Sequence, residues 1–337
     1  MNRALDRAPA EAEPAGLAGQ VARLFFDRQL TKVEIAARLG ISRFRVARLV
    51  ERALADGIVR IEFRDAPWED RELARAIEER FGLDLCAVAQ DSDDPVGAAA
   101  SLAGGIVDGL VGSGDAVGIA WGSTVARVVA AIPARKDPSI DVVQLAGSSA
   151  RLEAADPGDL TRVLAERLGG RSHRLHAPAF VASAELRAAL AQEPEIAATL
   201  RSFDHLAVAI LGIGAFGSGK ERPNSSLVRS GALTNREIDR LMRQGAVGDL
   251  LVHPFDGSGR FVAPELARRA MAIGVDQLRR VATVVAVAAG AAKVGAIRGA
   301  LATTVIRVLV TDAAVARGLL AASADQPQPT PSRRRRR

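Results

Sequence analysis

The sequence predicts two domains: a small all-α (winged) helix-turn-helix domain and, after it, a large α/β domain with a mainly parallel sheet. Residues 31–56 show the pattern of two short helices joined by a tight turn. From residue 83 onward, short apolar runs alternate with helical stretches, as in a parallel sheet whose two faces are covered by helices. A chain of 337 residues with 48% hydrophobic content is long enough to fill two cores.

The first helix of the helix-turn-helix is predicted to begin at Thr31. Thr31 and Glu34 have the spacing of a capping box, in which each side chain bonds a free backbone donor of the first turn. Gly40 ends this helix, since glycine readily adopts the left-handed conformation that turns the chain. Ser42 then caps a second helix, which Gly57 ends. The apolar face of the second helix is predicted to consist of Val46, Leu49, Val50, Ala53 and Leu54.

The other side of the second helix carries arginines, at positions 43, 45, 48 and 52. An arginine on a helix in the major groove can bind guanine with two hydrogen bonds, or phosphate when it lies further from the bases. The alternative is a solvated basic face, but the capped helices and the three-residue turn favour DNA. We predict operator DNA as a partner, contacted by Thr31, Ser42, Arg43, Phe44, Arg45 and Arg48.

Charge is unevenly distributed along the chain. Residues 1–64 hold 12 Lys and Arg against 8 Asp and Glu, and residues 333–337 add five arginines to a total net charge of +6. The residues between them are therefore slightly acidic and have no general attraction for polyanions. The predicted organisation is a disordered segment (1–16), the helix-turn-helix domain (17–64), a linker (65–70), a ligand-binding and oligomerisation domain (71–322) and a disordered basic tail (323–337).

Other local patterns complete the expected fold. A short helix should begin at Leu17, residues 58–63 alternate like the strand of a wing, and residues 71–81 form an amphipathic helix. A second capping box, Thr234 with Glu237, predicts a helix before a turn in the sequence GAVGD. The predicted strands are 85–89, 116–121, 140–145, 206–212, 281–288 and 305–310.

Targeting and metal-binding signals are missing from the sequence. The first 16 residues contain no apolar core for export, and no long apolar run reads as a membrane span. We therefore expect a cytoplasmic protein with no membrane partner. The single cysteine, Cys86, cannot form an internal disulfide, and no Cys or His cluster has metal-ligand spacing. We expect no metal and no cofactor.

Ligands of an open α/β sheet bind beyond the carboxyl ends of the strands, so the turns there are candidate sites. Gly122, Ser123 and Thr124 follow a strand and open a helix, where free backbone donors and hydroxyls can bind an anion. An ordinary helix cap after a glycine turn is an equally weighted alternative. Lys293 follows the apolar strand at 281–288 and opposes a helix dipole, which an anionic ligand would offset. Alternatively, its stem lies along the surface.

Three further turns offer weaker signals. Gln144 and Gly147 stand at one strand end, and Gly212 and Gly214 at another, where glycines permit close backbone approach or merely tight geometry. Within the sequence GAVGDLLVHPFDGSG, Asp249 and Asp256 could accept hydrogen bonds from sugar hydroxyls, although a solvated Asp in a turn is the simpler reading. The candidate ligand residues are Gly122, Ser123, Thr124, Gln144, Gly147, Gly212, Gly214, Asp249, Asp256 and Lys293.

The ordered set of motifs resembles the SorC family of bacterial sugar-responsive transcriptional regulators. Over about residues 17–320 these motifs are the helix-turn-helix, GDAVGIAWGST, VVQLAGSS, FVASAELRAAL, LGIGAFGS, GAVGDLLVHPFDGSG, VAAGAAKVGAI and VLVTDAAVA. The resemblance implies a sugar-isomerase or CoA-transferase-like domain without catalysis, assembled into dimers or tetramers. It also implies that residues 122–124 and Lys293 hold an effector's phosphate, where it has one, with Asp249 and Gln144 near its hydroxyls.

Two departures from the family pattern stand out. Ala289 occupies a position where the family often has glycine, and the arginine tail lies outside the pattern. The leading hypothesis is a DNA-binding transcriptional regulator, without catalytic residues, whose operator binding is controlled by a sugar, polyol or sugar phosphate. The alternative is a phosphosugar isomerase-like enzyme fused to a DNA-binding domain, with Asp249 or Asp256 as base.

Overall fold

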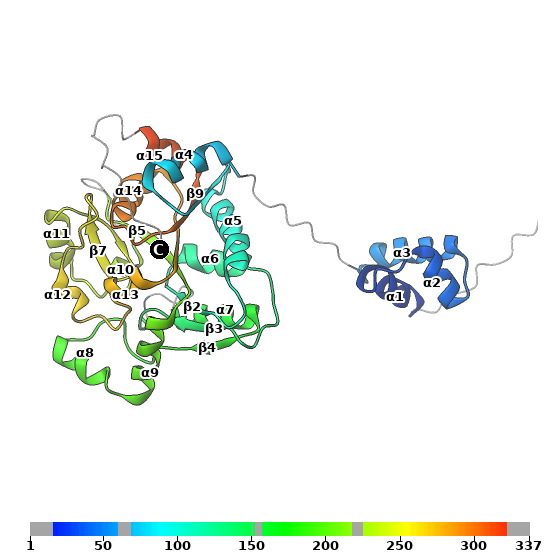
Figure 1. The fold of residues 1–337 in the computed structure, drawn as a ribbon, viewed down its shortest axis with the longest axis horizontal. Coiled ribbons are helices and arrows are strands. Elements are labelled where there is room, and N and C mark those ends of the chain that lie inside the picture. The colour runs from blue at the N-terminus through cyan, green and yellow to red at the C-terminus, as the bar shows by residue number, and fades with distance from the viewer. Residues whose placement is uncertain (1–15, 60–68, 150, 152–156, 218–224, 322–337) are drawn as a thin grey trace, which may run out of the picture. The chain divides into compact units, whose positions relative to one another are not determined.

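The computed structural model describes residues 16–59, 69–149, 151, 157–217 and 225–321. The chain divides into two compact units, Met1–Asp65 and Ala66–Arg337 (Figure 1). The predicted terminal segments, 1–16 and 323–337, lie outside the described residues except for Gly16. The two units are described separately below.

The small unit contains the predicted helix-turn-helix. Its elements are α1 (Leu17–Ala22), the π-helix η1 (Arg23–Asp27), α2 (Lys32–Leu39) and α3 (Arg43–Ala55). The backbone N–H of Thr31 donates to Glu34 Oε2 at 2.7 Å, and the Glu34 N–H donates to Thr31 Oγ1 at 3.3 Å, which completes the capping box. Gly40 has the left-handed φ of 65°, and the Ser42 hydroxyl accepts from the N–H of Arg45 at 3.2 Å. The predicted helix bounds and caps are confirmed.

A separate apolar core supports these helices. Four of the five residues of the predicted apolar face of α3 are buried, and the fifth, Leu54, is 38% exposed. Leu54 is the second-last residue of α3, at the end of the helix. Of the predicted wing, residues 60–63 lie outside the described residues, and Ile58 and Val59 are not in a strand.

The large unit is built on a mainly parallel sheet in the order β1-β9-β8-β5-β2-β3-β4, in which every neighbouring pair is parallel. The strand bounds are β1 (Leu85–Ala89), β2 (Ala116–Ile119), β3 (Asp141–Gln144), β4 (Arg171–His173), β5 (Val208–Ala215), β8 (Thr283–Val287) and β9 (Val308–Asp312). Strand β6 (Ala246–Leu250) pairs antiparallel with the end of β5, and β7 (His253–Asp256) pairs antiparallel with β6.

Helices cover both faces of the parallel sheet (Figure 1). One apolar cluster joins α5 (Pro95–Leu110), α6 (Ser123–Ala131) and α7 (Pro157–Leu168) to one face, and another joins α4 (Arg71–Phe81), α14 (Val294–Ala302) and α15 (Ala313–Ala321) to the opposite face. Alternate residues of β5 enter opposite clusters, because side chains of a strand point to alternate faces. This double burial explains why the strands read as continuous apolar runs.

The remaining helices surround this layered core. They are α8 (Ala184–Leu190), α9 (Pro194–Ser202), the 3₁₀ helix η3 (Phe203–His205), α10 (Ser226–Arg229), α11 (Asn235–Arg243), α12 (Pro264–Ala267), α13 (Val275–Arg280) and the 3₁₀ helix η4 (Ala291–Lys293). Helix α11 begins at the predicted capping box, with the Thr234 N–H donating to Glu237 Oε2 at 2.8 Å.

The predicted fold class is confirmed, and all six predicted strands are present. Three local expectations differ from the structure. The short, exposed β4 was missed because its sequence, Arg-Ser-His, has no apolar run. In the sequence GAVGD, Gly245 lies in a turn as expected, but the following residues belong to strand β6, since their backbone pairs with β5 and β7. The predicted linker included Glu69 and Asp70, but Glu69 bridges Ala89 and the carboxylate of Asp70 caps α4.

The order of the strands singles out one edge of the sheet. From β2 the chain proceeds to β3 and β4 on one side, and then returns to β5 on the other side of β2. Strands β2 and β5 therefore flank a topological switch point, where helices and loops diverge and leave a crevice at the carboxyl ends. The antiparallel pair β6–β7 extends from the same end of β5 and can provide a second wall.

Candidate functional site

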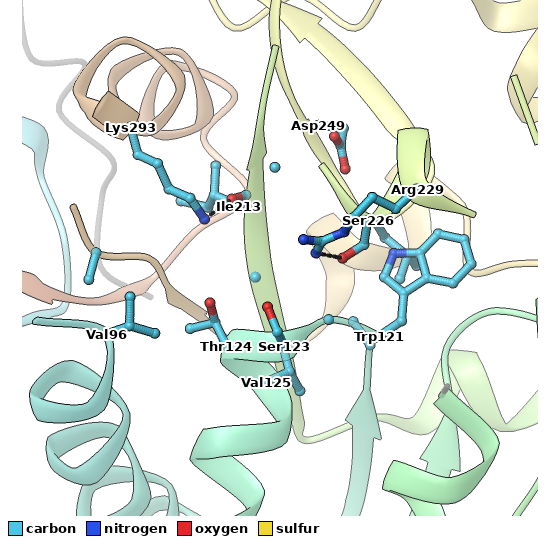
Figure 2. A pocket seen from close by; sticks show the side chains of 16 residues that line it. Val96, Trp121, Ser123, Thr124, Val125, Ile213, Ser226, Arg229, Asp249 and Lys293 are labelled. Carbon is cyan, nitrogen blue, oxygen red and sulfur yellow. Dashed lines mark hydrogen bonds between the residues drawn. The ribbon is translucent and has the colours of Figure 1, made fainter. Parts of the chain in front are cut away.

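A cavity of about 200 Å³ opens at this switch point, at the carboxyl ends of β2, β5 and β8 (Figure 2). It is lined by residues from seven segments of the large unit, namely Val96, 120–125, 212–214, Ser226, Arg229, Asp249, Leu251, Ala289 and Lys293. Seven of the ten predicted ligand residues are in this lining: Gly122, Ser123, Thr124, Gly212, Gly214, Asp249 and Lys293.

The first wall is the N-terminus of α6. Gly122 has a φ of 124°, which allows the chain to turn from the strand directly into the helix. The first hydrogen bond of the helix runs from the Ala126 N–H to the Gly122 carbonyl at 2.9 Å. The N–H groups of Ser123, Thr124 and Val125 precede it and therefore have no acceptor within the helix. Together with the two hydroxyls, they form a set of donors suited to an oxyanion.

Lys293 approaches from η4, just before α14. Its amine points into the site and donates to the Ile213 carbonyl of β5 at 2.9 Å (Figure 2). Burial lowers the pKa of this amine, although the Asp249 carboxyl acts in the opposite direction. The side chain is therefore fixed inside the cavity and does not lie along the surface, which removes the alternative considered from the sequence.

Helix α10 contributes two lining residues that the sequence reasoning missed, Ser226 and Arg229. An Arg229 guanidinium N–H donates to the Ser226 hydroxyl at 3.1 Å (Figure 2). A Cβ placed on Gly122 would lie 3.4 Å from the Ser226 oxygen, so α10 stands directly opposite the start of α6. Trp121, also missed, is 3% exposed and lines the same space. The sequence signal that could have revealed α10 is the Ser225–Ser226 pair, which begins a short helix that also carries Arg229.

Asp249 lies on β6, opposite Gly214 of β5, and is 3% exposed. Burial raises the pKa of its carboxyl from 3.8 to about 7, against the opposing influence of the Ser225 hydroxyl, Lys293 and Arg229. The Ser225 hydroxyl donates to Asp249 Oδ1. Near neutral pH, Asp249 is therefore able both to donate and to accept a hydrogen bond, depending on its protonation.

Three predicted ligand residues lie outside the lining. The amide of Gln144 is fully buried and links Ala146 O, at 2.6 Å, to the N–H of Leu175, at 3.1 Å. Gly147 allows a close backbone approach, since a Cβ there would meet a carbonyl oxygen of the chain at 2.5 Å. Asp256 is engaged in its own turn, accepting from Ser258 and Arg260. Each of these residues has a structural explanation.

Five of the six predicted DNA-binding residues lie in the first half of α3 or cap it, and the sixth, Thr31, caps α2. Arg43, Phe44 and Arg48 are exposed, and the Arg43 guanidinium lies 4.9 Å from the centroid of the Phe44 ring. Phe44 is 70% exposed, so its ring is accessible on the same side of α3 as the arginine. Thr31 and Ser42 are the N-caps of α2 and α3, respectively, so each of them begins one of the two helices.

The described residues lack a membrane-spanning helix and a cluster of metal ligands. No helix in this part of the chain is long and apolar enough to cross a membrane. No group of three or more His, Cys, Asp and Glu side chains in the same residues could hold a metal ion. Cys86, which is 1% exposed, has a pKa that burial and two nearby glutamates raise to about 12.

Comparison with known proteins identifies the large unit. Residues 66–321 match the family model described as "Putative sugar-binding domain". This match covers most of the chain. The chain belongs to the SorC family of sugar-binding transcriptional regulators. It is 28% identical to the erythritol catabolism regulatory protein EryD of Brucella abortus (strain 2308) over 90% of this chain and 96% of that protein.

The sorbitol operon regulator of Klebsiella pneumoniae is a second relative, 28% identical over 89% of this chain and 96% of its own length. The crystal structure of full-length SorC from the same organism superposes with a TM-score of 0.69, covering 90% of this chain and 98% of that chain. These relatives are regulators and not enzymes. The protein is accordingly a transcriptional regulator, and the isomerase-like hypothesis has no support.

Proposed function

We propose that this regulator binds a small phosphorylated sugar or polyol in the cavity at the switch point, and that this effector controls binding of the small unit to operator DNA. The observation that carries the proposal is the convergence of the α6 N-terminus with two basic side chains, Arg229 and Lys293, around one cavity. A phosphate group matches these donors in charge and geometry.

The cavity is partly open, so one part of an effector can extend beyond it. Its volume of about 200 Å³ accommodates the phosphate end of a small sugar or polyol. The buried Asp249, with a pKa of about 7, gives the opposite wall a group that can pair with the hydroxyls of such a molecule.

The cavity also explains how an effector could act at a distance. One wall belongs to the parallel sheet and its helices, and the other to α10 and to Asp249 of strand β6, with Leu251 just after it. A ligand held by both walls fixes their relative position. We infer that this closure alters the packing of subunits in a homodimer or homotetramer, and hence the spacing of the helix-turn-helix heads on an operator in the cytoplasm.

A thermal-shift screen tests the ligand class. Sugars, polyols and their monophosphates are compared with inorganic phosphate, and a molecule bound only by the folded protein raises its melting temperature. We expect small monophosphates to give the largest shifts. Larger shifts for the unphosphorylated compounds than for their phosphates would contradict the phosphate assignment, since Arg229 and Lys293 would then lack an anion.

The coupling to DNA needs a separate measurement. An operator selected from random DNA by the purified protein is titrated with and without the best compound of the screen, alongside sedimentation velocity. The proposal expects operator affinity and the assembly, or its sedimentation coefficient, to change together. A change in operator affinity with an unchanged hydrodynamic shape would reject the oligomer-based mechanism while leaving the binding site intact.

A further inference from the structure

Ser225 stands behind the cavity wall and touches both sides of the α10–β6 contact. Its side chain is almost fully buried and is absent from the cavity lining. Its hydroxyl hydrogen goes to Asp249 Oδ1, and its oxygen accepts from the N–H of Leu227 at 3.0 Å. One hydroxyl therefore fixes the orientation of the buried carboxyl and caps the helix that carries Arg229.

Helix α10 depends on such contacts for its position. It is four residues long, far shorter than a helix that is stable by itself in water. The fully buried Leu227 anchors its middle, and the Ser230 hydroxyl closes its end by donating to the Leu227 carbonyl at 2.6 Å. Ser226 and Arg229, the two residues of α10 that line the cavity, are therefore held in place by the contacts of Ser225, Leu227 and Ser230.

The fold leaves dedicated space for the link between Ser225 and Asp249. A Cβ on Gly214 would fall 2.2 Å from Asp249 Oδ1 and 2.8 Å from the Ser225 oxygen. Only glycine is compatible with this packing at that position of β5. The hydrogen-bonded pair is therefore packed tightly against β5 at Gly214.

We propose that Ser225 is a positioning residue for effector binding, which sets Asp249 and the Ser226–Arg229 face of α10 in register across the cavity without touching the effector. The effector in this proposal is that of the proposed function. The internal link, which is the hydrogen bond from Ser225 to Asp249 together with the N-cap of α10, does not depend on that function. Loss of the hydroxyl leaves Asp249 without its hydrogen-bond donor and α10 without its N-cap. The Asp249 carboxyl and the Ser226–Arg229 face are then no longer held in a fixed relative position.

The internal link is tested without any ligand. Carboxyl carbons of Asp are labelled with ¹³C, and the resonance of Asp249 is assigned by its loss in Asp249→Asn. The hydroxyl of Ser225 stabilises the carboxylate, so the Ser225→Ala variant should raise the pKa of Asp249 above the wild-type value. Lys293 and Arg229, the other charged groups that act on this carboxyl, are unchanged in the variant. An unchanged pKa would reject the link.

The effect on binding is measured with glycerol 3-phosphate and inorganic phosphate. Trp121 lines the cavity, and Trp68→Phe makes it the sole tryptophan, so its fluorescence reports binding. Ser225→Ala should weaken glycerol 3-phosphate roughly tenfold, the amount expected for a lost buried hydrogen bond. Ser225→Thr, which keeps the hydroxyl, should restore most of the affinity and the wild-type pKa.

Ser230→Ala is the matched control, because it also removes a buried hydroxyl from α10 but has no contact with Asp249. It should leave the pKa of Asp249 unchanged and weaken both probes less than Ser225→Ala does. Equal losses in the two variants would reduce Ser225 to an ordinary helix cap and overturn the proposal. If the wild type bound neither probe, the phosphate-binding function would fail, while the Asp249 titration would still decide the role of Ser225.

Discussion

The two proposed binding surfaces of this regulator are built in opposite ways. The proposed DNA-binding surface comes from one continuous stretch, residues 31–56, and its arginines are mostly exposed. The proposed effector cavity is assembled from segments as far apart as Val96 and Lys293, and its acid, Asp249, is buried. Water and salt screen the exposed charges of the arginines. Burial, in contrast, shifts the pKa of an acid, so the charge of a buried carboxyl depends on pH near neutrality.

This difference predicts two different dependences on conditions. Operator binding should weaken steeply as salt concentration rises, because cations released from DNA return to it. Effector binding should respond more to pH, since the pKa of Asp249 is raised by burial to about 7 and that of Lys293 is lowered by burial. The variants described next test this contrast, beginning with the largest expected effect.

The largest effect is expected for Asp249→Asn on stability. The folded-state pKa of about 7 exceeds the ordinary value of 3.8, so the folded state binds the proton more tightly and wild-type stability falls as pH rises between these values. Above pH 7 the buried carboxylate costs up to about 4 kcal/mol, from 1.36 kcal/mol per pKa unit. Asn retains an acceptor for Ser225 and no charge. The free energy of unfolding in urea should therefore rise at pH 8 relative to wild type.

At pH 5, where wild-type Asp249 is mostly protonated, the gain from Asn should shrink. Asp256→Asn is the matched comparison, because the pKa of Asp256 is lowered, first by the Ser258 hydroxyl, and that carboxylate stabilises the fold. It should destabilise at pH 8. An Asp249→Asn gain of equal size at both pH values would show that the buried charge is not its cause.

The second-largest effect is expected for Lys293→Ala on the ligand concentration that is needed to change operator occupancy. A charged hydrogen bond to a phosphate contributes about 1.5–3 kcal/mol, so the variant should require roughly ten- to a hundredfold more ligand for the same change in operator occupancy. Operator binding without ligand should stay at the wild-type level, because the lysine belongs to the large unit. Lys136→Ala, at an exposed site, is the control. An unaltered ligand response would remove Lys293 from the site.

The contrast between the units also explains what the sequence could predict. The helix-turn-helix depends on neighbours along the chain, such as Thr31 with Glu34, and its caps and helix bounds followed from spacing alone. Strands of the parallel sheet were recognisable because burial on both faces leaves continuous apolar runs. Seven of the ten predicted ligand residues line one cavity, since the carboxyl ends of neighbouring parallel strands meet there.

The missed residues depend on pairing that no local pattern records. Strand β6 contains Gly248 and Asp249, which read as a turn, and it is a strand because β5 and β7 pair with it on either side. Arg229 reaches the cavity through a four-residue helix that the Ser225 hydroxyl ties to β6. Gln144 was misjudged for the converse reason: a polar residue at a strand end can satisfy buried backbone groups instead of a ligand.

A smaller effect is expected for single arginines on α3. Replacing Arg48, or Arg43, by Ala should cost about 1–3 kcal/mol where the residue reads a base, and it should relax preference at one base pair. Where it contacts phosphate, affinity should fall for all sequences and the salt dependence should flatten by about 0.9 log units per contact. Footprinting at several salt concentrations distinguishes an arginine that contacts a base from one that contacts phosphate. Unchanged operator affinity for Arg43, Arg45 and Arg48 variants alike would refute the assignment of α3.

The smallest effect compares the two capping boxes, one in each unit. Thr31→Ala should destabilise α2 by about 1 kcal/mol, and Thr234→Ala should do the same to α11, because each loses the acceptor for one helix N–H. The apolar core of the small unit is separate from the clusters of the large one. Thr31→Ala should therefore weaken operator binding and leave ligand affinity unchanged, whereas Thr234→Ala should spare operator binding without ligand. Calorimetry with each variant locates the loss, and a cap mutation that lowered both transitions equally would show that the two units unfold as one.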